Sequence, residues 1–374
     1  MSEIDMGISS KDKKKKKKQS LWQSINTGLF PCRTDTAAEI ARKIVFMVAL
    51  VVLLSAVAMI AAHYLQYVRL DREAVVGDDG ERKTTDGRVY DLKNQTPTNR
   101  EIDNLPAGTI NEKYAALYNE NQDFIGWLNV PGTNIDEPVV QTENNDDYLH
   151  TNFQGEYEFA GTLFADYEGK ITPDGMPQNT IIYGHNMILK YMFAALHNYK
   201  EDIDFLKGSP IINFDTLYHN NRYKIISVFL TNIDEDYGEV FEYTRKVYFK
   251  SKADFYDYVL ECEDRSLYST GVDIEYGDEF LTLSTCDKDT GLDLRLVVVA
   301  RKVRPNESLY IDPAQIVKKD SVKYFQAYYD IYGPQWFGRT WDIGLVKGMD
   351  EYIKENHLED DPANYKREQT SLNW

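Results

Sequence analysis

The sequence of 374 residues predicts a mainly β domain that closes into a barrel, preceded by one transmembrane helix. The barrel is predicted because short β-branched and aromatic runs recur between turn residues, with few long helices between them. The helix is predicted because residues 44–62 contain no charge and would span about 28 Å, close to the hydrocarbon thickness of a bilayer. The aromatic content of 13%, with 27 tyrosines, indicates a packed globular fold and argues against disorder.

Nine short segments carry the apolar pattern of strands and are bounded by turn-forming residues. They are residues 124–130, 135–141, 161–167, 180–183, 211–214, 223–230, 246–250, 279–285 and 294–303. Apolar residues at helical spacing predict peripheral helices over residues 111–121, within residues 191–206 and over residues 252–265.

Charge around the apolar run predicts the orientation of the chain in a membrane. Residues 1–43 carry ten Lys or Arg and five Asp or Glu, whereas the remaining residues carry 32 and 55. By the positive-inside rule, residues 1–43 are a cytoplasmic basic tail, residues 44–62 a single-pass anchor, and everything beyond about residue 63 is extracytoplasmic. Small residues near the end of the run, Ala58, Ala61 and Ala62, leave a cleaved signal peptide as the alternative.

Composition divides the extracytoplasmic part into three segments. Residues 63–109 are polar and lack periodicity, so they are expected to form a linker, and residues 110–303 form the globular domain. Residues 304–374 form a C-terminal extension with helices predicted over 313–333 and 350–356. The strongly acidic balance argues against nucleic acid as a partner, because phosphate binding needs clustered cations.

Cys286 is the candidate nucleophile. It ends the predicted strand LTLSTC, a turn follows, and Arg295 lies early on the next predicted strand. A hairpin would place the thiol beside a permanent cation, which favours the thiolate. His185 in YGHN, where a short strand ends at a glycine, is the candidate proton acceptor and donor. Together these groups suit acyl transfer through a thioester, with the arginine binding the carbonyl oxygen.

These motifs resemble the signature of the sortases, in which a TLxTC strand is preceded by a histidine and followed by an arginine. The run GWLNVPGTNIDEPVVQ, the segments NNDDYLHTNF and GTLFADY, and a helix before TLSTC are similar to class B sortases. This resemblance covers about residues 110–303. It implies a closed eight-stranded barrel and a membrane-anchored cysteine transpeptidase of Gram-positive bacteria, with no cofactor and no metal.

The resemblance also implies the substrates and the residues that bind them. Such an enzyme cleaves a C-terminal sorting motif (LPxTG- or NPxTx-like) of a secreted protein after Thr. It then passes the fragment to an amine of the cell wall or of a pilin. Asn145 and Leu149, with Ser284, would line the substrate groove. Asp287 follows the cysteine at a place where the family tolerates an acid, and a simple turn former explains it equally well.

Other residues of the same types are expected to be bystanders. Cys262 shares a helical face with Phe255 and Val259, which indicates a core position, and Cys32 lies before the anchor. His150 is the rival of His185, and Arg301 is the rival of Arg295. The sequence leaves open whether the Cys–His pair is neutral or ionic. It also leaves open a cysteine peptidase that hydrolyses the thioester, and an inactive anchored scaffold.

The extension crowds aromatic residues between positions 324 and 341, so this face must be buried against something. Burial on the barrel would make the extension a structural brace. A position near the groove would make it a gate for substrates or amines.

Overall fold

The computed structural model describes residues 30, 31, 33, 35–73, 110–187, 191–333 and 335–358. The chain divides into two compact units, Met1–Val76 and Gly77–Trp374. The lysine run, Cys32, residues 74–109 of the predicted linker and residues 359–374 lie outside the described residues.

The first unit contains the apolar helix α2 (Ala37–Glu73). It begins earlier than predicted because Thr36 and Glu39 form a capping box. The Glu39 carboxylate accepts from the Thr36 amide at 2.9 Å, and the Thr36 hydroxyl accepts from the Glu39 amide at 3.4 Å. The segment Ala37–Ala61 is long and apolar enough to cross a membrane, and of its described residues only Lys43, at its basic end, is buried. A core helix of a soluble protein would be covered.

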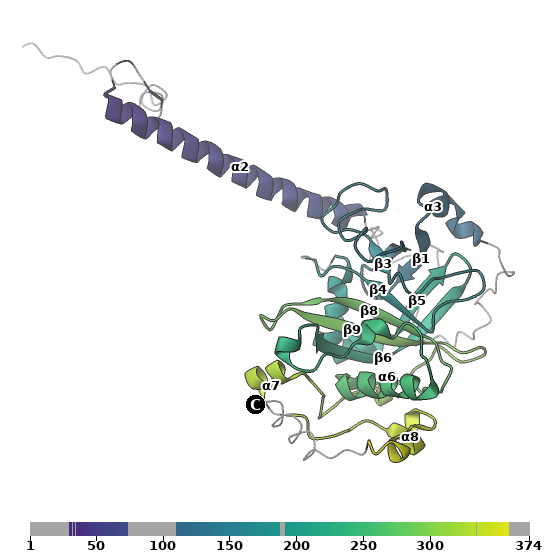
Figure 1. The fold of residues 1–374 in the computed structure, drawn as a ribbon. Coiled ribbons are helices and arrows are strands. Elements are labelled where there is room, and N and C mark those ends of the chain that lie inside the picture. Colours follow the sequence, from purple (N-terminus) through teal and green to yellow (C-terminus); the bar gives the residue numbers. More distant parts are fainter. Residues whose placement is uncertain are drawn as a thin grey trace, which may run out of the picture. The chain divides into compact units, whose positions relative to one another are not determined.

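The second unit contains a closed barrel of eight strands in the order β1-β2-β3-β4-β8-β9-β6-β5, which confirms the predicted architecture (Figure 1). The strands are β1 (Phe124–Asn129), β2 (Asp136–Val140), β3 (Leu163–Ala165), β4 (Asn179–Tyr183), β5 (Ile211–Thr216), β6 (Asn220–Asn232), β8 (Phe280–Asp287) and β9 (Leu294–Lys302). Two pairs, β2–β3 and β4–β8, are parallel, and the other described pairs are antiparallel.

Helices and turns surround the barrel. They are η2 (Glu112–Tyr114), α3 (Ala115–Glu120), η4 (Phe193–Leu196), α4 (His197–Glu201), α5 (Ile203–Gly208), η5 (Glu235–Tyr237), η6 (Tyr243–Arg245) and α6 (Lys252–Arg265). The one or two helices predicted within residues 191–206 are thus three short ones. Asp202 separates α4 from α5 because its side chain accepts from the Asp204 amide and caps α5.

Helix α6 coincides with its prediction. Ser251 caps it, and it buries Phe255, Val259 and Cys262 in an aromatic-rich core cluster that includes Phe229 of β6. Cys262 is fully buried, which confirms its core assignment.

The predicted strand over residues 246–250 is wrong. Val247 and Phe249 are buried as the alternation suggests, but no ladder forms. The Val247 carbonyl accepts from the Asn179 amide at 3.0 Å, and the Phe249 amide donates to the Gln178 side chain at 2.7 Å. The alternating apolar pattern therefore correctly predicted which side chains are buried, but it did not predict the backbone conformation, which depends on the hydrogen-bonding partners.

The predicted helix over residues 313–333 is wrong for its first half. That half forms η7 (Pro313–Gln315) and β10 (Val317–Lys318), which pairs with β7 (Tyr268–Ser269) after α6. Only α7 (Gln326–Tyr332) is helical in the second half. The predicted helix over residues 350–356 is confirmed as α8 (Met349–Glu355), which follows η8 (Ile343–Leu345).

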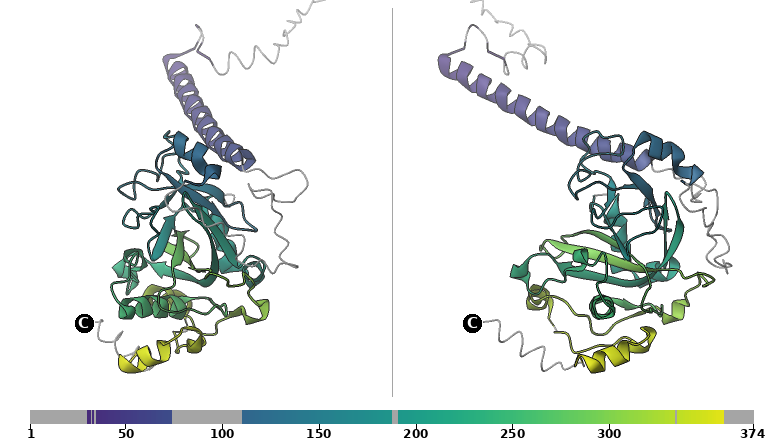
Figure 2. Two further views of the ribbon diagram at one scale, coloured as in Figure 1. Left: turned by 90° about the vertical axis from the view of Figure 1, so that its right-hand side faces the viewer. Right: turned by 45° about the vertical axis from the view of Figure 1, so that its right-hand side comes forward.

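The described part of the extension packs on α6. Trp341, Val346, Met349 and Ile353 belong to the same core cluster as the buried face of α6. Asp264, 3% exposed at the end of α6, accepts from Trp341 Nε1 at 2.8 Å and from Arg339 Nε at 3.0 Å. Figures 1 and 2 show α8, in yellow, on the same side of the barrel as α6. This arrangement agrees with the brace interpretation.

Two aromatic side chains of the extension, one buried and one exposed, test whether the extension is a brace. Trp341→Ala should lower the free energy of unfolding by about 3–5 kcal/mol, because it empties a core site and leaves Asp264 short of a donor. Phe337→Ala is the matched control, since Phe337 is 56% exposed, and should change it by less than about 0.5 kcal/mol. Denaturant titration followed by circular dichroism measures both. Equal losses in the two variants would contradict the brace.

Candidate active site

The parallel pairing of β4 with β8 brings His185 and Cys286 to one edge of the barrel. Tyr183, the last residue of β4, pairs with Ser284 of β8, so the carboxyl ends of the two strands coincide. His185 follows β4 by two residues, and Cys286 lies two residues beyond Ser284. The Thr285 hydroxyl donates to the Gly184 carbonyl at 2.8 Å and secures this junction.

The antiparallel pairing of β8 with β9 brings in the arginine. Cys286 and Arg295 are directly opposite each other in the ladder. Directly opposite residues of an antiparallel pair project from the same face, with Cβ atoms roughly 4.5–5.5 Å apart. The predicted hairpin is therefore formed, and its turn includes Gly291 in the left-handed region at φ +79°.

A cleft of about 270 Å³ contains all six residues that the sequence predicted for the site. Its lining is Asn145, Leu149, Thr162, Phe164, Tyr183, Gly184, His185, Ser284, Thr285, Cys286 and Arg295. A larger hollow of about 630 Å³ lies at the opposite ends of β8 and β9, beside Glu279 and Lys302, and contains none of the six. The thiol, the imidazole and the guanidinium thus share the smaller cleft.

Gly184 allows the histidine to take its place. A Cβ at this position would lie 2.5 Å from Leu163 Cδ2 and 2.8 Å from Phe193 Cγ. The residue is not in the left-handed region, so close packing of the two side chains, and not turn geometry, requires glycine here.

The ring of His185 is oriented by the main chain. Its Nε2 lies 2.9 Å from the Leu149 carbonyl oxygen, which can only accept, so Nε2 carries the proton and Nδ1 is the basic atom. Burial lowers the pKa of His185, the Leu149 carbonyl opposes this, and the neighbouring His150 adds to it. The shift favours the neutral form of the imidazole.

His150, the rival histidine, stacks on His185 with ring centroids 5.4 Å apart and planes 12° apart. It is exposed, its Nδ1 lies 3.0 Å from the Phe159 carbonyl oxygen, and it is outside the cleft lining. Its position beside His185 does not bring it to the thiol.

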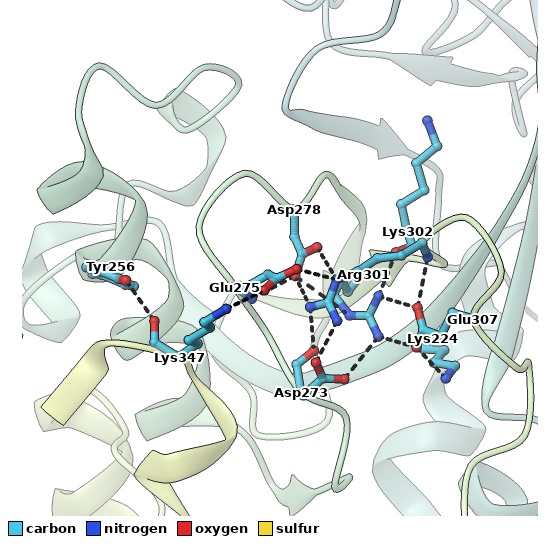
Figure 3. Close-up of polar contacts among 10 residues, drawn as sticks. Lys224, Tyr256, Asp273, Glu275, Asp278, Arg301, Lys302, Glu307 and Lys347 are labelled. Carbon is cyan, nitrogen blue, oxygen red and sulfur yellow. Dashed lines mark hydrogen bonds and ion pairs between the residues drawn. The ribbon is translucent and has the colours of Figure 1, made fainter.

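The two arginines of β9 differ in environment. Arg295 is partly exposed, and its hydrogen bonds within the described chain, to Asp293 Oδ1 and to the Leu294 carbonyl, are made by Nη1 at 3.0 Å. Arg301 is fully buried and donates to both carboxylate oxygens of Glu307 at 2.8 and 2.6 Å (Figure 3). Arg301 therefore belongs to a structural ion-pair network, and Arg295 faces the cleft.

The predicted groove residues have their polar groups engaged. Ser284 is 2% exposed, and its hydroxyl lies 2.7 Å from the hydroxyl of Tyr243 in η6. Burial raises the pKa of Tyr243 to about 12, so its phenol stays protonated. Asn145 donates to Asp166 Oδ2 at 3.0 Å, and Tyr183 donates to the same oxygen at 2.8 Å.

Sequence reasoning missed Tyr243 because it carries no motif and lies 41 residues before Ser284 in the chain. It also gave no role to Tyr183, although this residue opens the YGHN motif. Strand pairing alone brings these groups to the site.

Known proteins resemble this chain over the barrel. A family model described as the sortase domain matches residues 128–303. Sortase B of Listeria monocytogenes is 35% identical over 196 residues, which are 52% of this chain and 76% of the relative. The chain belongs to the sortase family. Sortase B of Staphylococcus aureus is 28% identical over the same shares of the two chains. The crystal structure of Bacillus anthracis sortase B in complex with AAEK1 covers 55% of this chain and 90% of its own, with 30% identity and a TM-score of 0.46.

The family identifies the chain as a sortase B-type cysteine transpeptidase.

A cluster of one histidine and two aspartates lies outside the cleft lining, at the end of strand β8. His197, Asp287 and Asp289 bring their ligand-type atoms within 4.8 Å of one another, the arrangement that could hold a metal ion within the described chain. The Lys200 ammonium, however, lies 2.5 Å from Asp287 and 2.6 Å from Asp289. The Lys200 ammonium therefore already pairs with both carboxylates.

The lowered pKa of His185 predicts the pH dependence of stability in this sortase. The unfolded chain binds a proton at an ordinary pKa of about 6.5, whereas burial keeps the folded imidazole neutral to lower pH. The contribution is thus fully present above about pH 6.5 and is lost as the pH falls through the folded value. The free energy of unfolding of the wild type should decrease more steeply than that of His185→Gln below pH 6.5, as denaturant titrations at several pH values would measure. A steeper loss in the wild type as pH rises would instead indicate an imidazolium paired with thiolate.

Proposed function

We propose that Cys286 is the nucleophile, His185 the general acid and base, and Arg295 the group that binds the carbonyl oxygen. One observation supports this assignment above all. The β4–β8 and β8–β9 pairings converge on a single cleft that contains the three side chains. The transpeptidase chemistry of the family needs a nucleophile, a proton carrier and an oxyanion ligand in that arrangement.

In the first half-reaction, the Cys286 sulfur attacks the Thr carbonyl carbon of the sorting motif and its proton passes to His185 Nδ1. The negative charge that develops on the carbonyl oxygen is stabilised by Arg295. Its Nη1 bonds to Asp293 and Leu294, whereas Nη2 and Nε make no hydrogen bond to the described residues. The scissile C–N bond then breaks, and His185 returns the proton to the leaving amine. A thioester between Cys286 and the substrate remains.

In the second half-reaction, an amine attacks the thioester and gives its proton to the same Nδ1 atom. Collapse of the tetrahedral intermediate breaks the C–S bond and leaves the new amide, and His185 returns its proton to the released Cys286 sulfur. A neutral resting imidazole is the form that can accept a proton in both half-reactions.

The substrates we propose are secreted proteins with a C-terminal LPxTG- or NPxTx-like sorting motif, and the acceptor is an amine of a peptidoglycan precursor or of a pilin. Both follow from the family resemblance. Asn145, Leu149 and Ser284 would line the groove for the motif. The polar groups of Asn145 and Ser284 already form hydrogen bonds within the protein. These two residues would therefore contribute the shape of the groove more than new hydrogen bonds to the substrate.

We also propose that α2 anchors the protein, with residues 1–43 cytoplasmic and the barrel outside. The exposed apolar span and the basic flank before it support this orientation. Protease added to intact cells with a permeable wall tests it, since protection of the barrel would reverse the orientation.

The nucleophile is tested with its matched cysteine. Cys286→Ala should reduce cleavage of a sorting-motif peptide and its transfer to an added amine to background. Cys262→Ala should keep the rate per folded molecule, because Cys262 is fully buried in the core and burial raises the pKa of its thiol well above the ordinary value. Residual turnover of the Cys286 variant would sink the assignment. Mass spectrometry of the products separates transfer from hydrolysis, and a product unchanged by added amine would indicate a peptidase.

The role of Arg295 is tested by comparing its lysine variant with that of Arg301. Arg295→Lys should lower kcat on the order of 10²-fold, because an ammonium cannot reproduce the planar fork of donors. Arg301→Lys should leave kcat per folded molecule unchanged and lower the free energy of unfolding by about 2 kcal/mol, since the two-point contact with Glu307 is lost. Single-turnover kinetics and denaturant titration measure the two effects. Equal losses of kcat would remove any special role for Arg295.

A further inference from the structure

The main-chain carbonyl of Cys286 lies beyond the end of its neighbouring strand. The Ser284 carbonyl accepts from the Gly184 amide at 3.3 Å, which shows that it points toward β4. Carbonyls alternate in direction along a strand, so the Cys286 carbonyl points the same way. Strand β4 ends at Tyr183, however, and offers no amide at that level.

Two side chains replace the missing strand. Asn186 Nδ2 donates to the Cys286 carbonyl oxygen at 2.9 Å, and His197 Nε2, from the first residue of α4, lies 3.3 Å from the same oxygen. The two donors also lie 3.1 Å from each other. When His197 Nε2 carries no proton, it accepts from the second amide hydrogen of Asn186. When Nε2 carries a proton, it donates to the Cys286 carbonyl oxygen. This oxygen therefore has a donor in both cases.

His197 is held in turn by the residue that follows the cysteine. Its Nδ1 lies 3.5 Å from Asp287 Oδ2, and the side chain of Asp287 is fully buried. Lys200, one turn further along α4, places its ammonium 2.5 Å from the same carboxylate oxygen. A buried carboxylate costs free energy unless it is paired. Here His197 and Lys200 both contact the Asp287 carboxylate, so α4 is bound to the residue that follows Cys286.

We propose that His197 is a positioning residue, which with Asn186 fixes the Cys286 peptide and thereby aims the thiol at the cleft. His197 is absent from the cleft lining, so it acts through Cys286 and not on the substrate. This inference rests on the proposed role of Cys286 as nucleophile. A misplacement of about 1 Å at a reacting atom can cost about 10²-fold in rate, which is why a carbonyl anchor matters to chemistry.

Two isosteric amides separate the anchor from a merely structural role. In His197→Gln the amide nitrogen reaches the place of Nε2 and keeps the contact with the Cys286 carbonyl. In His197→Asn the amide reaches only the place of Nδ1, so it keeps Asp287 and loses the carbonyl. We expect kcat for peptide cleavage to fall by about 10- to 100-fold in the Asn variant, with KM and melting temperature unchanged, while the Gln variant stays near the wild type. The same pair of substitutions at His219, a histidine in the larger hollow, is the control and should show no difference.

Alkylation of Cys286 by iodoacetamide, located by mass spectrometry, is the second readout. It should be slower at neutral pH in His197→Asn than in His197→Gln, because the thiol is no longer held beside Arg295. This readout reports the position of the thiol independently of turnover. Failure of the nucleophile, seen as activity in Cys286→Ala, and failure of the anchor are therefore separate results. Equal kcat and equal alkylation in the Asn and Gln variants would overturn the proposal, whether both match the wild type or both fall.

Discussion

The parallel pairing of β4 with β8 is the constraint on which the site depends. An all-antiparallel barrel would place the end of β4 beside the start of β8, about a strand length from Cys286. The parallel register instead sets Tyr183 against Ser284 and puts His185 and Cys286 at one edge. The barrel is closed, so neither strand can shift its register without breaking the pairings on its other side. The relative position of imidazole and thiol is therefore a property of the whole sheet.

Buried charged residues lie at both ends of the β8–β9 pair. At one end an arginine is paired with a glutamate, and at the other an aspartate is paired with a lysine. Arg301 is neutralised by Glu307, which also binds Lys224, and the resulting network ties the chain after β9 to β6. Asp287 is neutralised by Lys200 from α4, next to Cys286. Buried pairs contribute little net stability because desolvation offsets their attraction, but they require one specific geometry. At the Cys286 end, that geometry orients the peptide on which the proposed chemistry takes place.

The C-terminal extension changes how the rest of the barrel domain is covered. Trp341 and Met349 complete a core that α6 alone would leave open, and Asp264 receives donors from Trp341 and Arg339. None of the residues that line the cleft comes from the described part of the extension. Its aromatic side chains are thus accounted for largely by packing at a distance from the thiol.

The sequence by itself determined the class of fold, the apolar span and helix α6, because short-range patterns encode them. Its local motifs also singled out Cys286, His185 and Arg295 as candidates, and the three residues line one cleft. Only the tertiary structure decided that residues 246–250 form no strand and that residues 316–325 form no helix, since those backbones follow their hydrogen-bonding partners. It also gave the physical difference between Arg295 and Arg301, which share a strand and a residue type, because Arg301 is fully buried and Arg295 is partly exposed. It alone brought His197 to the carbonyl of Cys286, 89 residues away, because strand pairing and helix packing, and not sequence spacing, create that contact.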